Sequence, residues 1–180
     1  MKSFTLVLFF LIFSSSSFAR SIKTVDSVDP QKFVGTWYRI SSRPIILEPS
    51  CACARQVLKA NSNNTVGVLN TCNKDSVGGK PVSIEGYATP LDNSFSKFDV
   101  RFKGAPLTGS YWVVALDDDY NWAVVSDKYG FSLYVMSRKP QLSKDDYMKA
   151  ITEAASNGAP VDKLEIQVQN GCQPYPPEQT

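Results

Sequence analysis

The side chains best suited to chemistry in this chain are four cysteines and two runs of aspartate, and the chain has no histidine. The spacing of Cys51 and Cys53 is too tight for the usual zinc-binding pair, and no histidine can complete a mixed site, so we expect no metal site. An even number of cysteines is typical of structural disulfides formed in an oxidising compartment. The four cysteines, which include Cys72 and Cys172, allow three connectivities.

The absence of histidine also argues against most kinds of catalytic site. General acid–base catalysis near neutral pH and the activation of serine or cysteine nucleophiles usually depend on a histidine. We therefore expect no catalytic residue, no cofactor and no enzymatic activity.

The aspartate runs have structural explanations. The run 117–119 lies between two apolar strands and is interpreted as a solvated hairpin turn, although a carboxylate cluster or calcium loop is the alternative. Asp145 and Asp146 fit the first turn of a helix that Ser143 caps, where acids face the positive end of the helix dipole.

The N-terminal residues have the pattern of a secretory signal. Met1 and Lys2 precede an apolar run at 4–13, and small residues ending at Ala19 form a cleavage sequence. The apolar run is shorter than the roughly 20 residues that span a bilayer. We expect residues 1–19 to be removed, and residues 20–180 to form one domain outside the cytoplasm, either extracellular or, in a bacterium, periplasmic.

Two distant fragments indicate how the rest of the chain is organised. Gly35 and Trp37 lie on the first predicted strand and Arg138 follows the last, so tryptophan and arginine can meet only if the sheet closes on itself. Eight short strands separated by turns form an up-and-down antiparallel sheet, and eight is the number that closes around one small ligand. The predicted fold is therefore an all-β, eight-stranded barrel with one C-terminal helix and a short final strand. The expected strands are 36–42, 54–60, 66–72, 82–89, 97–103, 110–116, 121–126 and 131–137, with a helical turn at 30–33, the helix at 144–157 and the final strand at 163–169.

These residues resemble the lipocalin family. Gly35-x-Trp37, the acidic turn before Trp122 and Arg138 are similar to the family's three short signatures in their expected order, although the family usually has tyrosine in place of Trp122. The resemblance covers essentially the whole mature chain. It is closest to the branch of apolipoprotein D, the bacterial lipocalins and the plant temperature-induced lipocalins, through segments 85–88, 111–120 and 133–138.

The resemblance implies a lipocalin calyx in which Gly35, Trp37 and Arg138 are structural. Trp37 would close the bottom of the barrel with Arg138 over its ring, a contact worth about 0.5 to 2 kcal/mol.

The resemblance also bears on the disulfides. Similarity to apolipoprotein D implies that Cys53 pairs with Cys172, which leaves Cys51 for Cys72. Against this, the hairpin register would set Cys53 nearly across from Cys72.

A ligand would be contacted by the inward-facing residues, which strand geometry places at every second position. Each such residue could equally be simple core filling. From Trp37 and from the resemblance, the expected contacts are Arg39, Ser41, Gln56, Leu58, Val68, Ile84, Phe98, Val100, Phe102, Tyr111, Val113, Tyr134 and Met136.

Arg39 is the most specific of these residues, because an unpaired buried charge is costly and a ligand carboxylate would pair with it. The competing interpretation places Arg39 at the solvated mouth or pairs it with an acid such as Glu85.

Three further features concern the surface of the protein: a predicted lid, a glycosylation sequon and the distribution of charge. Segment 43–49 is a predicted lid whose aliphatic side chains either cover the pocket or contact a membrane or a partner protein. Asn63 begins a glycosylation sequon on a probable turn. With a net charge of +2 and lysines scattered among acids, we expect no nucleic-acid binding and a monomer or weak dimer.

We therefore expect a secreted protein that carries or scavenges a small hydrophobic ligand, such as a fatty acid, lysolipid, sterol or pigment. The alternatives are an enzyme on the same barrel that acts on a lipid or pigment, through a pocket thiol or through acids, and an allergen-like or host-interaction protein that acts through its lid.

Overall fold

The computed structural model describes residues 21–44 and 50–173. The expected signal peptide and most of the expected lid lie outside these residues. Within the two ranges, neither helix has the length and hydrophobicity of a transmembrane span. The elements, in chain order, are α1 (Pro30–Phe33), β1 (Gly35–Ser42), β2 (Cys51–Ala60), β3 (Val66–Lys74), β4 (Pro81–Pro90), β5 (Lys97–Phe102), β6 (Thr108–Leu116), β7 (Trp122–Ser126), β8 (Leu133–Ser137), α2 (Lys144–Ser156) and β9 (Glu165–Ile166).

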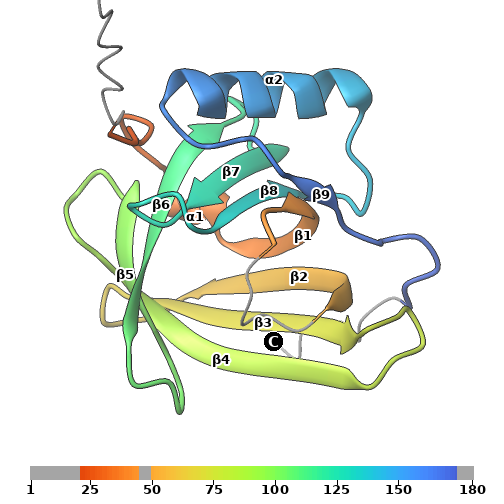
Figure 1. The fold of residues 1–180 in the computed structure, drawn as a ribbon. Coiled ribbons are helices and arrows are strands. Elements are labelled where there is room, and N and C mark those ends of the chain that lie inside the picture. Colours follow the sequence, from red (N-terminus) through yellow and green to blue (C-terminus); the bar gives the residue numbers. More distant parts are fainter. Residues whose placement is uncertain (1–20, 45–49, 174–180) are drawn as a thin grey trace, which may run out of the picture.

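The strands form one antiparallel sheet that closes into a barrel, with α2 lying across its outside (Figure 1). Strands β2 to β8 follow one another around the sheet, and β1 closes it because β1 pairs with β8 on one side and with β2 on the other. β9 pairs with β1 outside the barrel. The predicted eight-stranded barrel with one C-terminal helix and an outer strand is confirmed.

Apolar side chains form two clusters, one on each face of the barrel wall. The inner cluster includes Trp37, Val113 and Met136. The outer cluster lies under α2 and joins Val114 and Val124 of the wall to Ala150 of the helix. From Tyr111 to Val114, successive residues of β6 alternate between the inner and the outer cluster, as the two-residue period of a strand requires, and the bulge before Ala115 ends the alternation.

The helix α2 begins and packs as the sequence predicts. Ser143 caps it, since its hydroxyl accepts a hydrogen bond from the Asp146 backbone N–H at 3.1 Å. Ala150 and Ala154 are fully buried, and Tyr147 and Ile151 pack against the same cluster. This face holds α2 against β6 and β7.

A bulge in β1 overturns the expected position of Ser41. Arg39 pairs with Met136 of β8, but Ser41 pairs with the next residue, Val135, so Ile40 is an extra residue in the ladder. Because the bulge reverses the side on which the following side chain lies, Ser41 faces α2 and accepts a hydrogen bond from the Tyr147 hydroxyl at 3.0 Å. Ser41 is therefore a buried structural contact outside the barrel and does not line its interior.

The closed end of the barrel is built around Trp37 and Arg138. The guanidinium carbon of Arg138 lies 3.7 Å from the centroid of the Trp37 ring. Its nitrogens donate to the carbonyls of Lys32, Thr36 (3.1 Å) and Tyr120 (3.3 Å). The arginine thus ties α1, β1 and the β6–β7 turn together.

Gly35 is required beside this arginine. Its φ is +99°, which side chains rarely adopt, and a Cβ atom there would come within 3.3 Å of the Arg138 Nη1 atom. Any larger residue would therefore strain the backbone and crowd the guanidinium.

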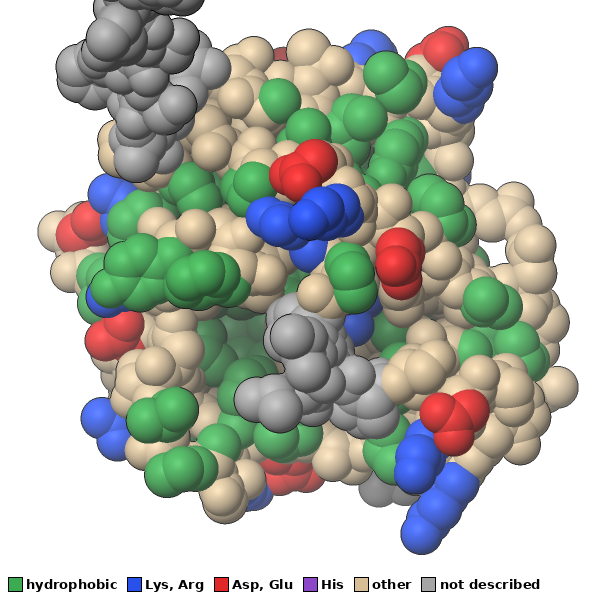
Figure 2. All heavy atoms as spheres, in the orientation of Figure 1, with side chains coloured by type: hydrophobic (Ala, Val, Ile, Leu, Met, Phe, Trp, Pro, Cys, Tyr) green, Lys and Arg blue, Asp and Glu red, His purple; other side chains and the backbone are tan. Residues whose placement is uncertain are grey.

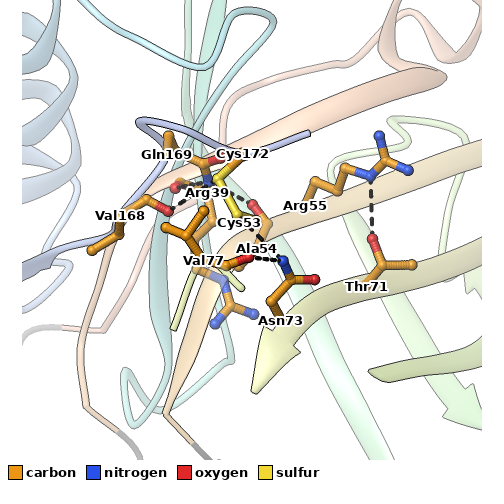
Figure 3. Close-up of a disulfide and its surroundings, with 10 residues drawn as sticks. All are labelled: Arg39, Cys53, Ala54, Arg55, Thr71, Asn73, Val77, Val168, Gln169 and Cys172. Atoms are coloured by element: carbon orange, nitrogen blue, oxygen red, sulfur yellow. Dashed lines mark hydrogen bonds between the residues drawn. A yellow bond between two sulfur atoms is a disulfide. The ribbon is translucent and has the colours of Figure 1, made fainter. Parts of the chain in front are cut away.

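The C-terminal segment fills a gap between β1 and β2. These strands pair directly only from Gly35 to Tyr38. Farther along, the Gln169 side-chain amide donates to the carbonyls of both Arg39 (2.9 Å) and Ala54 (2.8 Å), and the Cys53 N–H donates to the Val168 carbonyl (Figure 3). β9 is shorter than the expected strand at 163–169. After Ile166, single backbone hydrogen bonds, such as that from the Gln167 N–H to the Ile40 carbonyl, and the side-chain contacts of Gln167 and Gln169 take the place of a regular ladder.

The structure pairs Cys53 with Cys172 and Cys51 with Cys72. The alternative pairing of Cys53 with Cys72 fails because β2 has a bulge between Ala52 and Arg55. Cys53 has a φ of +59° within this bulge, and its sulfur is bonded to that of Cys172 in the C-terminal segment (Figure 3).

Candidate functional site: the barrel cavity

The barrel contains a cavity of about 730 Å³ that opens at the end opposite Trp37. Figure 2 shows this hollow with hydrophobic side chains in its wall. Its volume lies within the range of about 300 to 1,000 Å³ that is typical of small-molecule sites. All eight barrel strands or their ends contribute to the lining.

Most of the predicted contact residues lie on this cavity. β1, β2 and β3 contribute through polar and apolar side chains, whereas β5 and β8 contribute mainly large apolar ones. The predicted residues that line it are Arg39, Gln56, Val68, Ile84, Val100, Phe102, Tyr111, Tyr134 and Met136.

The structure places the other predicted contacts elsewhere. Leu58 and Phe98 line a separate apolar hollow of about 20 Å³ nearer the closed end. Val113 is fully buried in the inner cluster and lines neither space, because the closed end of the barrel is filled with side chains. Ser41 lies outside the barrel, as described above.

A chain of polar side chains crosses the barrel between the two spaces. The Tyr111 hydroxyl donates to the Gln56 Oε1 atom at 2.9 Å, and the Gln56 amide donates to the Asn70 Oδ1 atom at 3.0 Å. Burial raises the pKa of Tyr111, so its hydroxyl stays protonated and able to donate. Tyr111 lines both spaces, and this chain therefore forms the floor of the larger cavity.

Two arginines introduce positive charge into the cavity wall. The Arg39 guanidinium lies 4.5 Å from the centroid of the Tyr134 ring, which holds it over an aromatic face. Arg55 also lines the cavity and donates from Nε to the Thr71 hydroxyl at 3.2 Å. Glu85, the acid considered as a partner for Arg39, forms an exposed ion pair with Lys103.

Asp127 is the acidic side chain among the described lining residues, and its carboxylate is hydrogen-bonded within the β7–β8 turn. Its carboxylate accepts hydrogen bonds from the Tyr129 N–H (2.7 Å), the Ser132 N–H and the Ser132 hydroxyl (2.8 Å). Burial opposes ionisation of Asp127, but these hydrogen bonds outweigh it and hold the pKa below the usual value. The carboxylate is thus a structural anion of the β7–β8 turn.

Sequence reasoning missed several lining residues. Val125 of β7 pairs with Val113 and Tyr134, both predicted to face inward, so the same two-residue period would have found it. Cys51 and Cys72 also line the cavity. No signal in the sequence indicates that a disulfide would form part of the wall, because the bulge in β2 determines that position.

The other residues considered for a chemical role, the cysteines, the aspartates at 117–119 and Asn63, have structural partners. All four cysteines are in disulfides, so the pocket offers no thiol for a nucleophilic mechanism. In the 117–119 run, the Asp117 carboxylate accepts hydrogen bonds from the backbone and side chain of Asn121, as expected for a hairpin turn. Asn63 is exposed on the turn between β2 and β3, where its side-chain oxygen accepts a hydrogen bond from the Thr65 hydroxyl.

Comparison with known proteins places this architecture in a family. Residues 28–169 match the model of the lipocalin-like domain. Insecticyanin from the tobacco hornworm Manduca sexta has a similar fold, with a TM-score of 0.63 and 17% identity over 81% of this chain and 83% of that one.

Two sequence relatives are similar over most of their length. Temperature-induced lipocalin-1 of Arabidopsis thaliana is 27% identical over 164 residues, which cover 86% of this chain and 87% of that protein. Apolipoprotein D of Bos taurus is 30% identical over 159 residues, which cover 82% of this chain and 80% of that protein. The chain belongs to the lipocalin family, in the branch of the temperature-induced lipocalins, the bacterial lipocalins and apolipoprotein D.

Proposed function

We propose that this lipocalin is a secreted carrier or scavenger of a single-chain amphiphile with an acidic head group, such as a fatty acid or lysolipid. Lipocalins are known for binding small hydrophobic ligands. The observation that carries the proposal is an open, largely apolar cavity with Arg39 held over Tyr134 in its wall.

The charges in the wall favour an acidic ligand over a basic one. Among the described lining residues, Arg39 and Arg55 contribute two cations and Asp127 contributes one carboxylate, which is hydrogen-bonded within its own turn. A guanidinium binds a carboxylate or phosphate through charge-assisted hydrogen bonds. The hydrocarbon chain would then lie against Val100, Phe102 and the other apolar residues that line the cavity.

Apolar burial would supply most of the affinity. Each buried methylene contributes about 0.8 kcal/mol, so a long alkyl chain gains several kcal/mol before the cost of association. The head-group contact would then select among ligands that share the same chain.

We propose secretion for two reasons. The N-terminal signal pattern directs export, and two disulfides are typical of an oxidising compartment. In a host that glycosylates, Asn63 would be modified at the closed end of the barrel, away from the mouth of the cavity. We assign no catalytic role to the cavity.

The first test is native mass spectrometry of mature protein purified from its own host, followed by extraction of anything bound. We expect a stoichiometric acidic lipid. An empty barrel that also ignores fatty acids, retinoids and lysolipids in titrations would refute the carrier function.

The role of Arg39 is tested by comparing a long-chain fatty acid with the alcohol of the same chain length. In Arg39→Gln, fatty-acid affinity should fall by about tenfold or more, as expected for loss of a charged hydrogen bond. Affinity for the alcohol should hardly change. The matched control is Arg101→Gln, which changes an exposed arginine outside the cavity lining and should leave both affinities unchanged. Equal losses for acid and alcohol in Arg39→Gln would contradict the head-group assignment.

A further inference from the structure

The interior of the barrel is divided into two spaces that share part of their walls. The smaller hollow, nearer the closed end, is lined by apolar side chains and by Tyr111, and it has room for about one methyl-sized group. Val68, Val100 and Tyr111 line both this hollow and the larger cavity. A ligand in the cavity is therefore separated from the smaller hollow only by whatever crosses the barrel between them.

The polar floor, formed by Tyr111, Gln56 and Asn70, crosses the barrel at this boundary. Gln56 is the buried central member, since its Oε1 atom accepts from the Tyr111 hydroxyl and its amide donates to the Asn70 Oδ1 atom. Gln56 pairs with Trp37 on one side and with Asn70 on the other, so the floor lies in the same row as the tryptophan that closes the barrel. An apolar residue at position 56 would serve packing equally well, and the polar floor therefore calls for a reason beyond packing.

An alkyl chain cannot pass this floor without a net loss of affinity. To reach the smaller hollow, the chain must break the hydrogen bond between Tyr111 and Gln56 and leave both groups unpaired inside the barrel, which lowers affinity by roughly tenfold or more. The hollow then accepts about one methylene, whose burial raises affinity only about fourfold. The floor therefore stays closed against an apolar chain.

We propose that Tyr111 and Gln56 determine the length of the alkyl chain that the cavity accepts. This inference rests on the proposed function, because it takes Arg39 as the contact of the acidic head group. The chain extends from the head group toward the closed end and stops at the floor. Carbons beyond that length must bend back or lie toward the mouth, where they bury less surface.

The register of the strands gives the expected length. The head group lies near Tyr134, which is three residues from Ser137 along β8. Ser137 pairs with Tyr38, Tyr38 pairs with Arg55, and Gln56 is one residue farther toward the closed end. Four residues of strand span about 13 Å. Because C–C bonds of about 1.5 Å advance a zigzag chain by about 1.3 Å each, about ten carbons reach the floor.

The test is titration with straight-chain fatty acids of about 8 to about 18 carbons, below their critical micelle concentrations. In the wild type, each added methylene should raise affinity about fourfold until the chain reaches the floor, and much less beyond that length. In Gln56→Ala the rise should continue for about two more carbons, so the longer acids should bind about tenfold more tightly. The matched control is Gln141→Ala, which changes an exposed glutamine outside both linings and should keep the wild-type profile.

Two further substitutions make the test specific. Ala88 lines only the smaller hollow, and Ala88→Val narrows it. Combined with Gln56→Ala, it should return the length limit toward that of the wild type. Tyr111→Phe removes the hydrogen bond to Gln56 but keeps the ring, and it should shift the limit in the same direction as Gln56→Ala. It replaces Gln56→Ala if far-UV circular dichroism shows that variant to be unfolded.

Three results would overturn the inference. They are a wild-type affinity that rises evenly through the whole series, a length limit unchanged when the floor is altered, and a longer limit that Ala88→Val does not reverse. In each of these cases the acids still bind, so the carrier function stands. An absence of binding at every chain length would refute the carrier function itself, and with it this inference.

Discussion

Replacing Arg138 with alanine should destabilise the protein by about 3 kcal/mol. Trp37 is only 1% exposed, so the contact between its ring and the guanidinium is shielded from water and belongs near the upper part of the range of about 0.5 to 2 kcal/mol. The substitution also removes the donors to three backbone carbonyls. Because Arg138 is half-buried, water can replace part of each bond, and we allow about 0.5 kcal/mol for each one.

Urea unfolding followed by far-UV circular dichroism, with both disulfides intact, measures this loss. With a slope of about 2 kcal/mol per molar urea, the midpoint should fall by about 1.5 M. Arg138→Lys keeps the charge but loses the flat guanidinium, and should show about half of the effect. Arg101→Ala, on an exposed position, should change stability by less than about 0.5 kcal/mol.

The reasoning would be refuted in two ways. A midpoint shift below about 0.5 M for Arg138→Ala would mean that the closed end does not depend on this contact. Full stability in Arg138→Lys would mean that charge alone is sufficient and that stacking on Trp37 contributes nothing.

Three further predictions concern the wall and the floor of the cavity. Asp127→Asn should cost about 1 kcal/mol at neutral pH. The pKa of Asp127 is lowered in the folded state, so the stability difference between wild type and Asp127→Asn should be constant above the unfolded-state pKa of about 3.9 and vanish as pH falls through the folded-state pKa. A stability difference that stays constant at all pH values would contradict this prediction. Replacing Cys53 and Cys172 with serine should destabilise more than replacing Cys51 and Cys72, roughly 5 against 3 kcal/mol in the loop-entropy model, since the loops span 119 and 21 residues; the reverse order in urea unfolding would refute this. Tyr111→Phe should cost about 1 kcal/mol by removing the hydrogen bond to Gln56, as measured by thermal unfolding, and no change would show that the polar floor is not stabilising.

The architecture could be predicted because it depends on patterns repeated along the chain. Alternation and turns located the strands, and the pairing of Trp37 with Arg138 indicated closure of the sheet. Val68, Val100 and Phe102, which the resemblance to the family implied would face inward, line the cavity.

The sequence could not indicate the places where this period is broken. Ile40 is an ordinary strand residue, and only the ladder to β8 shows that it is extra, so Ser41 was predicted on the wrong side. The contact between Tyr111 and Gln56 joins strands that are not neighbours in the sheet, and depends on the diameter of the closed barrel. Local patterns carry no information of that kind.

The gap between β1 and β2 has a consequence for how the protein is made. Synthesis delivers the segment around Gln169 and Cys172 only after all eight barrel strands have emerged, yet that segment bridges the carbonyls of Arg39 and Ala54. The wall beside Arg39 therefore cannot be completed on a growing chain, and its completion is a late step with a long loop to close. Oxidation of Cys53 with Cys172 would mark its completion, so the appearance of this disulfide reports how much of a newly synthesised population has finished folding.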